Sequence, residues 1–295
     1  MSAMASGKLL SSWSTASYVV RAVASAPTGP FTAVQDVLPV FHHNPQVVRH
    51  PDGTFLLFTI GQTLNSASEA ASGGAVFRTE LHYASSIVGP WQSLGCIING
   101  SNPAPHVMPN GTVVVAYKGL PNGLRIATAS HWRGPYTTLL KPGSSTACCG
   151  DKSGHESCCG EILLSPRSYG HPYVEDFFIW FDQAASRWSI VLHQYELPNK
   201  GMSPGGFAYS ADASLLSSWH LANRSVYGLE IVLANGSSLH ADRQRPKLLF
   251  DVAGYQPRYL YNGLDLSGQK APTHTVVQEI QNWTPPYDDD GQYFG

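Results

Sequence analysis

Four pairs of polar residues occupy positions at which β-strands usually place apolar side chains. Each pair opens a predicted strand, and the pairs are His43-Asn44, Ser101-Asn102, Glu175-Asp176 and Gln244-Arg245. Imidazole, amide, carboxylate and guanidinium groups that converge on one place can bind or transform a small molecule. Turn chemistry explains Asn44 and Asn102 equally well, because Asn before Pro favours the start of a loop. It explains Glu175-Asp176 poorly, because this acidic pair runs directly into the apolar segment Phe177–Phe181.

A short motif that recurs three times indicates where strands must begin and end. Each copy places an Ala five residues before a Gly-Pro-aromatic triplet, and the copies are Ala24–Phe31, Ala84–Trp91 and Ala129–Tyr136. A degenerate fourth copy is Ala208–Ser210, followed by Trp219. Alternating or β-branched residues precede each copy, so we expect a strand, a turn and a second strand.

A second unit lies between these motifs and supplies two more strands to each repeat. It reads as a strand, a tight turn and a strand, and its copies are Asn44–Phe58, Asn102–Tyr117, Asp176–His193 and Arg245–Asn262. Their first residues lie 58, 74 and 69 residues apart. Four strands per repeat without helical periodicity favour the blades of a β-propeller over a sandwich or a solenoid, which short regular strands would also fit.

The sequence therefore predicts an all-β fold, a five-bladed β-propeller. Three blades and most of a fourth are visible, and we expect the strands within Tyr18–Phe31 and Thr273–Ile280 to share a fifth blade that is incomplete or closed by both termini. The predicted organisation is a tail at 1–16, a single domain at 17–281 with a Cys-rich insertion at about 141–170, and a tail at 282–295.

Composition restricts the classes of partner. The chain of 295 residues is 43% hydrophobic and 13% charged, with a formal net charge of −2, so we expect a folded monomer without a nucleic-acid partner. No apolar run approaches the roughly 18 residues of a membrane span, so we expect no membrane partner. The stretch Ala22–Ala26 resembles the end of a signal peptide, but Ser11, Ser12, Ser14 and Arg21 interrupt the preceding region. We therefore predict no signal peptide in this sequence and leave secretion open.

Four of the five cysteines cluster in the insertion, as Cys148, Cys149, Cys158 and Cys159. Cys-x-x-Cys spacing is absent, which favours disulfides or free thiols over a zinc site. Asn-x-Ser/Thr sequons occur at Asn99, Asn110, Asn223, Asn235 and Asn282, where turn chemistry and glycosylation are both open. We predict no cofactor and no metal.

Four segments in a fixed order carry a resemblance to a known family: Phe41–Gln46, Val174–Trp180, Gly205–Ser210 and Arg243–Asp251. They resemble an uncharacterised branch of the five-bladed propellers around glycoside hydrolase family 43, over nearly the whole chain from about Ser17. The resemblance implies a carbohydrate site in the channel, where inner strands supply a carboxylate base, a general acid and a third carboxylate that orients the acid.

The resemblance makes Asp176, with its neighbour Glu175, the candidate catalytic residue. Only one of the two faces the channel unless a bulge intervenes. The candidate substrate-binding residues are His43, Asn44, Asn102, His171, Arg243, Gln244 and Arg245. Arg243 and Arg245 can bind the carboxylate of an acidic sugar or neutralise Glu175 or Asp176. His42 is a further channel candidate.

Three positions depart from the motifs of that branch, where this chain has Phe177, Phe207 and Gln244. A Gln side chain cannot transfer a proton as a carboxyl group does, so Gln244 removes the best candidate for the acid. Glu161, Asp242 or Glu230 can substitute from a loop, although each also fits an ordinary surface carboxylate. Trp132 is a candidate for stacking on sugar rings, whereas Trp91, Trp180 and Trp219 fit structural packing better.

Two functions from different classes follow. The first is a glycoside hydrolase-like enzyme that acts on a poly- or oligosaccharide, which the acidic pair favours. The second is a catalytically silent propeller that binds a glycan or a protein partner, which Gln244 favours. A scaffold whose Cys-rich loop carries the function is a third hypothesis.

Overall fold

A computed structural model describes residues 1–4, 8, 12–61, 78–119, 123–140, 163, 173–195, 204–253, 256–265 and 274–287. His171, Glu161 and the four clustered cysteines lie outside these residues. The chain divides into two compact units. The first comprises Met1–Val23 and Phe31–Ile162, and the second comprises Ala24–Pro30 and Leu163–Gly295.

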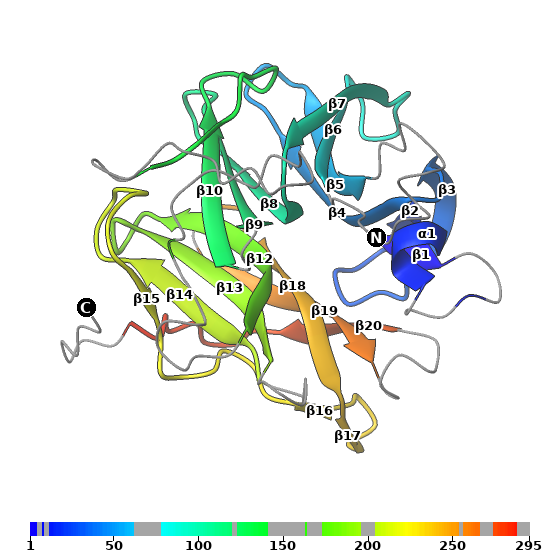
Figure 1. The fold of residues 1–295 in the computed structure, drawn as a ribbon. Coiled ribbons are helices and arrows are strands. Elements are labelled where there is room, and N and C mark those ends of the chain that lie inside the picture. The colour runs from blue at the N-terminus through cyan, green and yellow to red at the C-terminus, as the bar shows by residue number, and fades with distance from the viewer. Residues whose placement is uncertain are drawn as a thin grey trace, which may run out of the picture. The chain divides into compact units, whose positions relative to one another are not determined.

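The described residues of the first unit form three antiparallel sheets (Figure 1). Blade 1 consists of β1 (Ser2–Met4), β2 (Ser17–Val23) and β3 (Thr32–Leu38). Blade 2 consists of β4 (His42–Arg49), β5 (Phe55–Gly61), β6 (Arg78–Ala84) and β7 (Gln92–Ile98). Blade 3 consists of β8 (Ser101–Val107), β9 (Val113–Gly119), β10 (Gly123–Ala129) and β11 (Thr137–Thr138). A single helical turn, α1 (Trp13–Ala16), precedes β2.

The described residues of the second unit form two larger sheets and one hairpin. Blade 4 consists of β12 (Tyr173–Asp182), β13 (Arg187–Tyr195), β14 (Gly206–Ser210) and β15 (Trp219–Leu221). Blade 5 consists of β18 (Asp242–Phe250), β19 (Pro257–Asp265) and β20 (His274–Glu279). The hairpin pairs β16 (Glu230–Val232) with β17 (Ser238–His240). Together the five sheets confirm the predicted all-β, five-bladed propeller class with an incomplete first blade.

The C-terminal strand does not belong to the first blade, contrary to our expectation that the two ends share one. Strand β20 pairs with β19 over six residues and completes blade 5. Blade 1 instead gains its third strand from the N-terminus, where Ser2 lies opposite Val19 and Met4 opposite Ser17. A lone strand in the sequence could not show which edge it would join, because that choice depends on long-range pairing.

Both segments that we predicted to be tails contain ordered structure. The N-terminal segment supplies β1 and α1. In the C-terminal segment, the side chains of Trp283 and Tyr287 pack against the apolar cluster of the second unit. Aromatic side chains bury a large area, so these two residues stabilise the unit they cover.

The recurring Gly-Pro motif has one conformation in its three copies. Gly29, Gly89 and Gly134 have φ angles of 86°, 87° and 88°. Each donates its amide to the carbonyl three residues earlier, at 3.0, 2.9 and 2.9 Å. A positive φ is accessible to glycine at little cost, which explains why this residue occupies the turn in every copy.

Each unit has its own apolar core. In the first, Leu56, Phe58 and Leu81 of blade 2 pack with Val115 and Tyr117 of blade 3. In the second, side chains of blades 4 and 5 form the core, and its buried members include Trp180, Val191, Phe207, Leu248 and Leu260. Within β5 and β9 these residues occupy alternate positions and share one face of the sheet, and the residues between them are buried as well.

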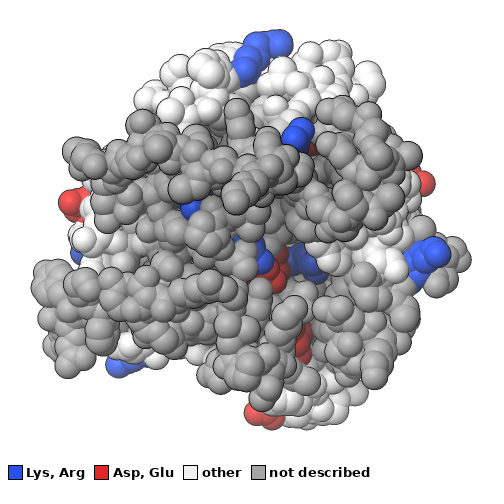
Figure 2. All heavy atoms as spheres, in the orientation of Figure 1, with Lys and Arg blue, Asp and Glu red and all other residues white. Residues whose placement is uncertain are grey.

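The charged residues that the structure describes are scattered over the face shown in Figure 2. On the face that Figure 2 shows, the described Lys, Arg, Asp and Glu side chains form small separate groups of both signs. The described part of this face therefore presents no extended patch of a single charge. Among the described residues, no helix is long and apolar enough to cross a membrane.

Candidate active site

The four polar pairs share one unusual backbone geometry. The second residues of the pairs, Asn44, Asn102, Asp176 and Arg245, have φ angles of 48°, 53°, 56° and 52°. Each lies where the first strand of its blade shifts register against the second strand. Asn and Asp tolerate this left-handed region, whereas Arg245 adopts it against the preference of its side chain. The sequence prediction that these pairs open equivalent strands agrees with this shared bulge.

The bulge in β12 brings the adjacent acidic residues Glu175 and Asp176 to the same place. Pairing shifts between Glu175 and Phe178, so the strict alternation of faces is interrupted here. One carboxylate oxygen of each residue and one ring nitrogen of His193 all lie within 4.8 Å of one another. Asp176 is 3% exposed, so its carboxylate is buried beside these partners.

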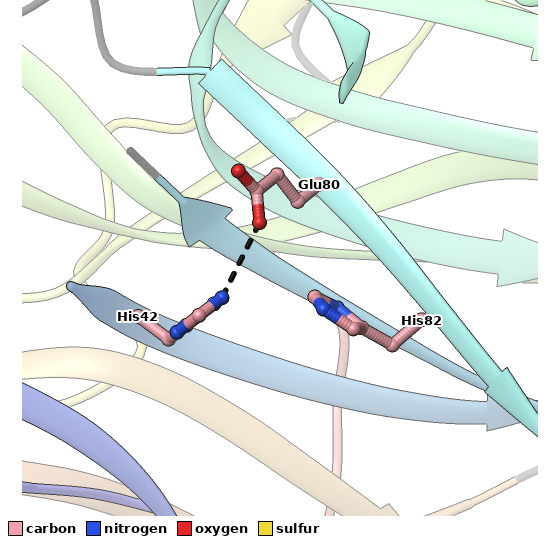
Figure 3. A group of neighbouring side chains, drawn as sticks. All are labelled: His42, Glu80 and His82. Carbon is pink, nitrogen blue, oxygen red and sulfur yellow. Dashed lines mark ion pairs between the residues drawn. The ribbon is translucent and has the colours of Figure 1, made fainter. Parts of the chain in front are cut away.

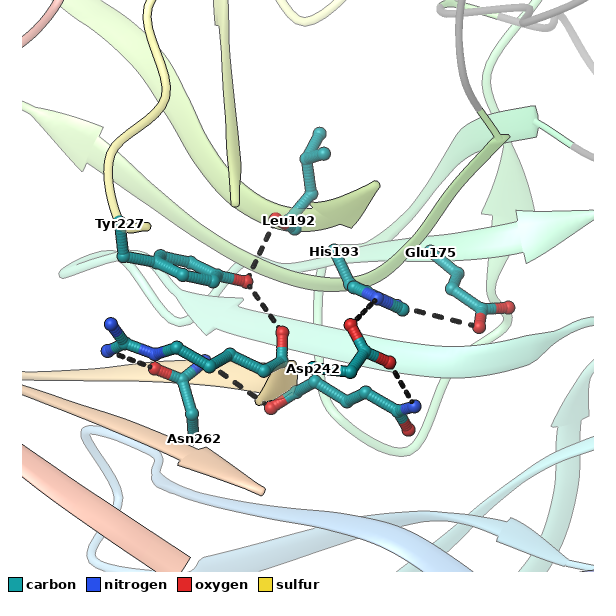
Figure 4. A network of polar contacts seen from close by, with 8 residues as sticks. Glu175, Leu192, His193, Tyr227, Asp242 and Asn262 are labelled. Carbon is teal, nitrogen blue, oxygen red and sulfur yellow. Dashed lines mark hydrogen bonds and ion pairs between the residues drawn. The ribbon is translucent and has the colours of Figure 1, made fainter. Parts of the chain in front are cut away.

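His193 of β13 lies between two carboxylates of the second unit (Figure 4). Its Nε2 lies 3.3 Å from Oδ1 of Asp242, and its Nδ1 lies 3.8 Å from Oε1 of Glu175. Asp242 is the first residue of β18, so two blades contribute to this cluster. We call Glu175, Asp176, His193 and Asp242 the carboxylate cluster.

Electrostatics in the carboxylate cluster favour the imidazolium form of His193. Burial opposes a positive charge, but the hydrogen bond to Asp242, the ion pair with Glu175 and the charge of Asp176 outweigh it and raise the pKa of His193 to about 9. Burial would also raise the pKa of Asp242, yet hydrogen bonding to His193 and the imidazolium charge lower it. Asp242 is therefore held ionised, which suits a base or an anchor and not a proton donor.

Gln244 contacts the second carboxylate oxygen of Asp242. Its Nε2 donates a hydrogen bond of 2.8 Å to Oδ2 of Asp242, while His193 occupies Oδ1. Gln244 therefore contacts the carboxylate cluster directly. A hydrogen bond to the charged form lowers a carboxyl pKa, so Gln244 adds to the ionisation of Asp242.

A lysine that we did not single out from the sequence lies near Asp176. Lys247 donates from Nζ to the carbonyl oxygen of Phe177 at 3.1 Å. Burial lowers the pKa of Lys247 to about 8, although the charge of Asp176 opposes this effect and that of Arg245 adds to it. His193 and Lys247 therefore each place a positive charge close enough to Asp176 to interact with its carboxylate.

Arg243 lies inside blade 5, where neutral groups surround its guanidinium. It is 1% exposed. It donates to the carbonyl of Gly228 at 3.2 Å and to the side-chain oxygens of Asn262 and Gln278 at 2.9 and 3.0 Å. Its guanidinium also lies 4.8 Å from the ring centroid of Tyr227. These contacts, which include Gly228 and Tyr227 outside the blade, hold the side chain inside the second unit.

Three further candidates belong to the first unit. His43 is buried, its Nδ1 lies 2.8 Å from Oγ of Ser17, and its ring lies 4.7 Å from that of Trp13. The amide of Asn44 donates to Oγ of Ser2 at 3.0 Å. Asn102 is 9% exposed within the bulge of β8.

The structure also accounts for the departures from the family motifs. Phe177 and Phe207 are both fully buried, and Phe207 packs edge to face on Trp180 in the aromatic core. Neither side chain has a polar group that could join the carboxylate cluster. Of the substitute acids, Asp242 joins the cluster, whereas Glu230 is exposed on β16.

The four tryptophans named in the sequence analysis differ in their surroundings. Trp180 and Trp219 are buried and Trp91 packs against an apolar cluster, as expected for structural residues. Trp132, our stacking candidate, is 2% exposed and donates from Nε1 to Oδ2 of Asp52 at 3.0 Å. The guanidinium of Arg133 lies 4.1 Å from its ring centroid, so Trp132 is engaged within the first unit.

His193 was missed at the sequence level although its position carried a signal. It is a polar residue near the end of the apolar strand Trp188–Leu192. That pattern resembles the polar strand openings that we did select. Its partner Asp242 lies 49 residues away, so only the folded chain shows that they meet.

Comparisons with known proteins find the fold but not a sequence family. No family model and no curated protein matches this chain. A family 43 glycoside hydrolase from Bacillus licheniformis matches with a TM-score of 0.56 and 12% identity, over 86% of this chain and 46% of its own. This chain thus spans about half the length of that protein.

Two other solved structures agree. An endo-arabinase from Bacteroides thetaiotaomicron matches with a TM-score of 0.50 and 15% identity, over 90% of this chain and 81% of its own. An endo-1,5-α-L-arabinanase from Thermotoga petrophila matches with a TM-score of 0.51 and 11% identity, over 82% of this chain and 57% of its own. The chain is therefore a five-bladed β-propeller with the fold of the family 43 glycoside hydrolases.

Proposed function

We propose that this chain is a glycoside hydrolase-like protein that acts on or binds a poly- or oligosaccharide at the carboxylate cluster. The observation that carries the proposal is the convergence of Glu175, Asp176 and Asp242 on His193, next to a bulge. Ionised carboxylates accept strong hydrogen bonds from hydroxyl groups, which are the groups that a sugar offers. The activities for which the structural neighbours are named, a family 43 glycoside hydrolase and two arabinanases, support the same class of ligand.

Hydrolysis of a glycosidic bond needs a proton donor and a carboxylate that activates water or attacks the sugar. Asp242 fits the second task, because its lowered pKa keeps it ionised. The proton donor is then Glu175, Asp176 or the imidazolium of His193, or a residue outside the described part of the chain. In this scheme Asp176 anchors the substrate or orients the acid, and Glu175 delivers the proton.

Binding without turnover is the second candidate function, and Gln244 favours it. Its amide donates to Asp242 and cannot transfer a proton, so this position of blade 5 supplies no acid. Replacing it with Glu would set two carboxylates side by side. Repulsion between like charges raises the pKa of one of them, which creates a proton donor.

The experiment combines calorimetric titration of a glycan panel with an assay of released reducing sugar. Asp176→Asn should abolish binding or turnover while the chain still folds, because the side-chain shape is kept and only the charge is lost. Glu230→Gln is the matched control, since it removes an exposed carboxylate of the same unit. If Asp176→Asn binds glycans as the wild type does, the proposed site is wrong.

Gln244→Glu separates the two candidate functions. A positioned acid contributes roughly 10²–10⁴-fold to a rate, so a gain of that size identifies a silent site that lacks its acid. If the wild type hydrolyses a glycan and Glu175→Gln lowers the rate of that hydrolysis, the chain is an enzyme. Absence of binding to every glycan in the panel would contradict both candidates.

A further inference from the structure

A second group of metal-ligating side chains lies in blade 2, on β4 and β6 of the first unit. Figure 3 shows His42 of β4 pointing toward Glu80 and His82 of β6. Nε2 of His42 lies 3.3 Å from Oε2 of Glu80, and one ligand atom from each of the three residues lies within 4.8 Å of the others. The side chains of His42 and Glu80 are 15% and 7% exposed, and His82 is 6% exposed.

The tautomer of His42 suits metal binding. Its Nδ1 lies 3.0 Å from the carbonyl oxygen of Pro39, which can only accept a hydrogen bond, so Nδ1 carries a hydrogen and donates it in this bond. With the proton on Nδ1, the lone pair of Nε2 points at the place where Glu80 and His82 meet. A backbone carbonyl that holds the distal nitrogen is the usual outer partner of a metal-binding His.

The backbone of β5 leaves room for the carboxylate of Glu80. Gly61 lies opposite His42 in the pairing of β4 with β5, and a Cβ added there would overlap the carboxyl group of Glu80. Only the missing side chain of Gly61 therefore lets Glu80 reach His42. The absence of a side chain at Gly61 thus leaves a space beside β5 that the carboxylate of Glu80 fills.

An ion pair between His42 and Glu80 explains only part of this arrangement. Nδ1 of His82 is buried and has no hydrogen-bond partner among the described residues. Buried polar atoms normally have a partner, so the unpaired Nδ1 of His82 indicates that His42, Glu80 and His82 share a further ligand.

We propose that His42, Glu80 and His82 bind a divalent transition metal of the zinc class. Two imidazoles and one carboxylate form a borderline donor set that Zn²⁺ takes in three-ligand sites, with one coordination position left for water or another ligand. Ca²⁺ and Mg²⁺ prefer oxygen donors, so this set discriminates against them. Sequence spacing did not predict the site, because the ligands come from two strands that only pairing with β5 brings together.

The test uses the full chain with its thiols blocked by N-ethylmaleimide, so that none of the five cysteines can bind the metal. After treatment with EDTA and desalting, Zn²⁺ alone is titrated by calorimetry, and bound metal is counted by mass spectrometry. His82→Gln should lower Zn²⁺ affinity at least tenfold. Gly61→Ala should do the same without removing any ligand, because its Cβ displaces Glu80.

His193→Gln is the control, because it alters the other group of potential ligands in the second unit and should leave this zinc site unchanged. Co²⁺ bound to the wild type should show a d–d spectrum without a thiolate charge-transfer band, a readout that survives even if a variant fails to fold. Absence of stoichiometric Zn²⁺ uptake by the wild type overturns the proposal. So does uptake that His82→Gln and Gly61→Ala leave intact, or that only His193→Gln abolishes.

Discussion

Replacing His193 with Gln tests whether the carboxylate cluster holds a positive charge on His193 at neutral pH. In the folded protein, the carboxylates around His193 raise its pKa to about 9 against the resistance of burial, whereas the ordinary value is 6.5. A Gln amide can still donate to Asp242 but cannot titrate. The substitution therefore removes the charge of the ring and its pH dependence and keeps one hydrogen bond.

The sign of the effect follows from the direction of the pKa change. Because the folded protein binds this proton more tightly than the unfolded chain, the stabilisation is complete below pH 6.5 and is lost as the pH rises to about 9. At about 1.4 kcal/mol per pH unit, this interval corresponds to about 3 kcal/mol. The difference in stability between wild type and His193→Gln should shrink by about that amount across this range.

Two measurements check the prediction. In spectra of protein labelled at the histidine ring carbons, one resonance should titrate near pH 9 and be absent from His193→Gln. Urea unfolding at pH 6 and pH 9.5 should give the change in stability. His274→Gln, which removes an exposed histidine of β20, is the matched control. A His193 resonance that titrates near pH 6.5, or parallel stability curves for wild type and variant, would refute the reasoning.

Three further substitutions address the structure around the site. Arg243→Met leaves the carbonyl of Gly228 and the side-chain oxygens of Asn262 and Gln278 without their donor. Urea unfolding should therefore show a loss of stability of about 3 kcal/mol. Unchanged stability together with weakened glycan binding would place Arg243 at the ligand instead. Tyr227→Phe removes a buried hydroxyl that lies 3.2 and 3.3 Å from the carbonyls of Leu192 and Arg243, and should cost about 1–2 kcal/mol by the same measurement; a neutral effect would mean that the hydroxyl gains nothing from these carbonyls. Phe207→Ala empties the aromatic core of the second unit and should cost about 3–5 kcal/mol by thermal or urea unfolding; a loss below about 1 kcal/mol would contradict the packing described for this residue.

Local patterns in the sequence determined the repeating part of this protein. The Gly-Pro-aromatic turns require a residue that tolerates positive φ, and the three glycines at these positions have it. The polar pairs were also visible in the sequence as polar residues ahead of apolar strands. That each pair lies at a register shift of its strand was seen only in the structure.

Only the tertiary structure decided which of these polar residues act together. Arg243 and Gln244 are neighbours in β18, yet Arg243 is enclosed in blade 5 while Gln244 binds Asp242. His193 meets a carboxylate 49 residues away, and β20 joins blade 5 and not blade 1. The physical reason is that strand pairing is a long-range choice and that a bulge changes which face a side chain takes. The charge of each group depends in turn on the neighbours that this pairing brings near.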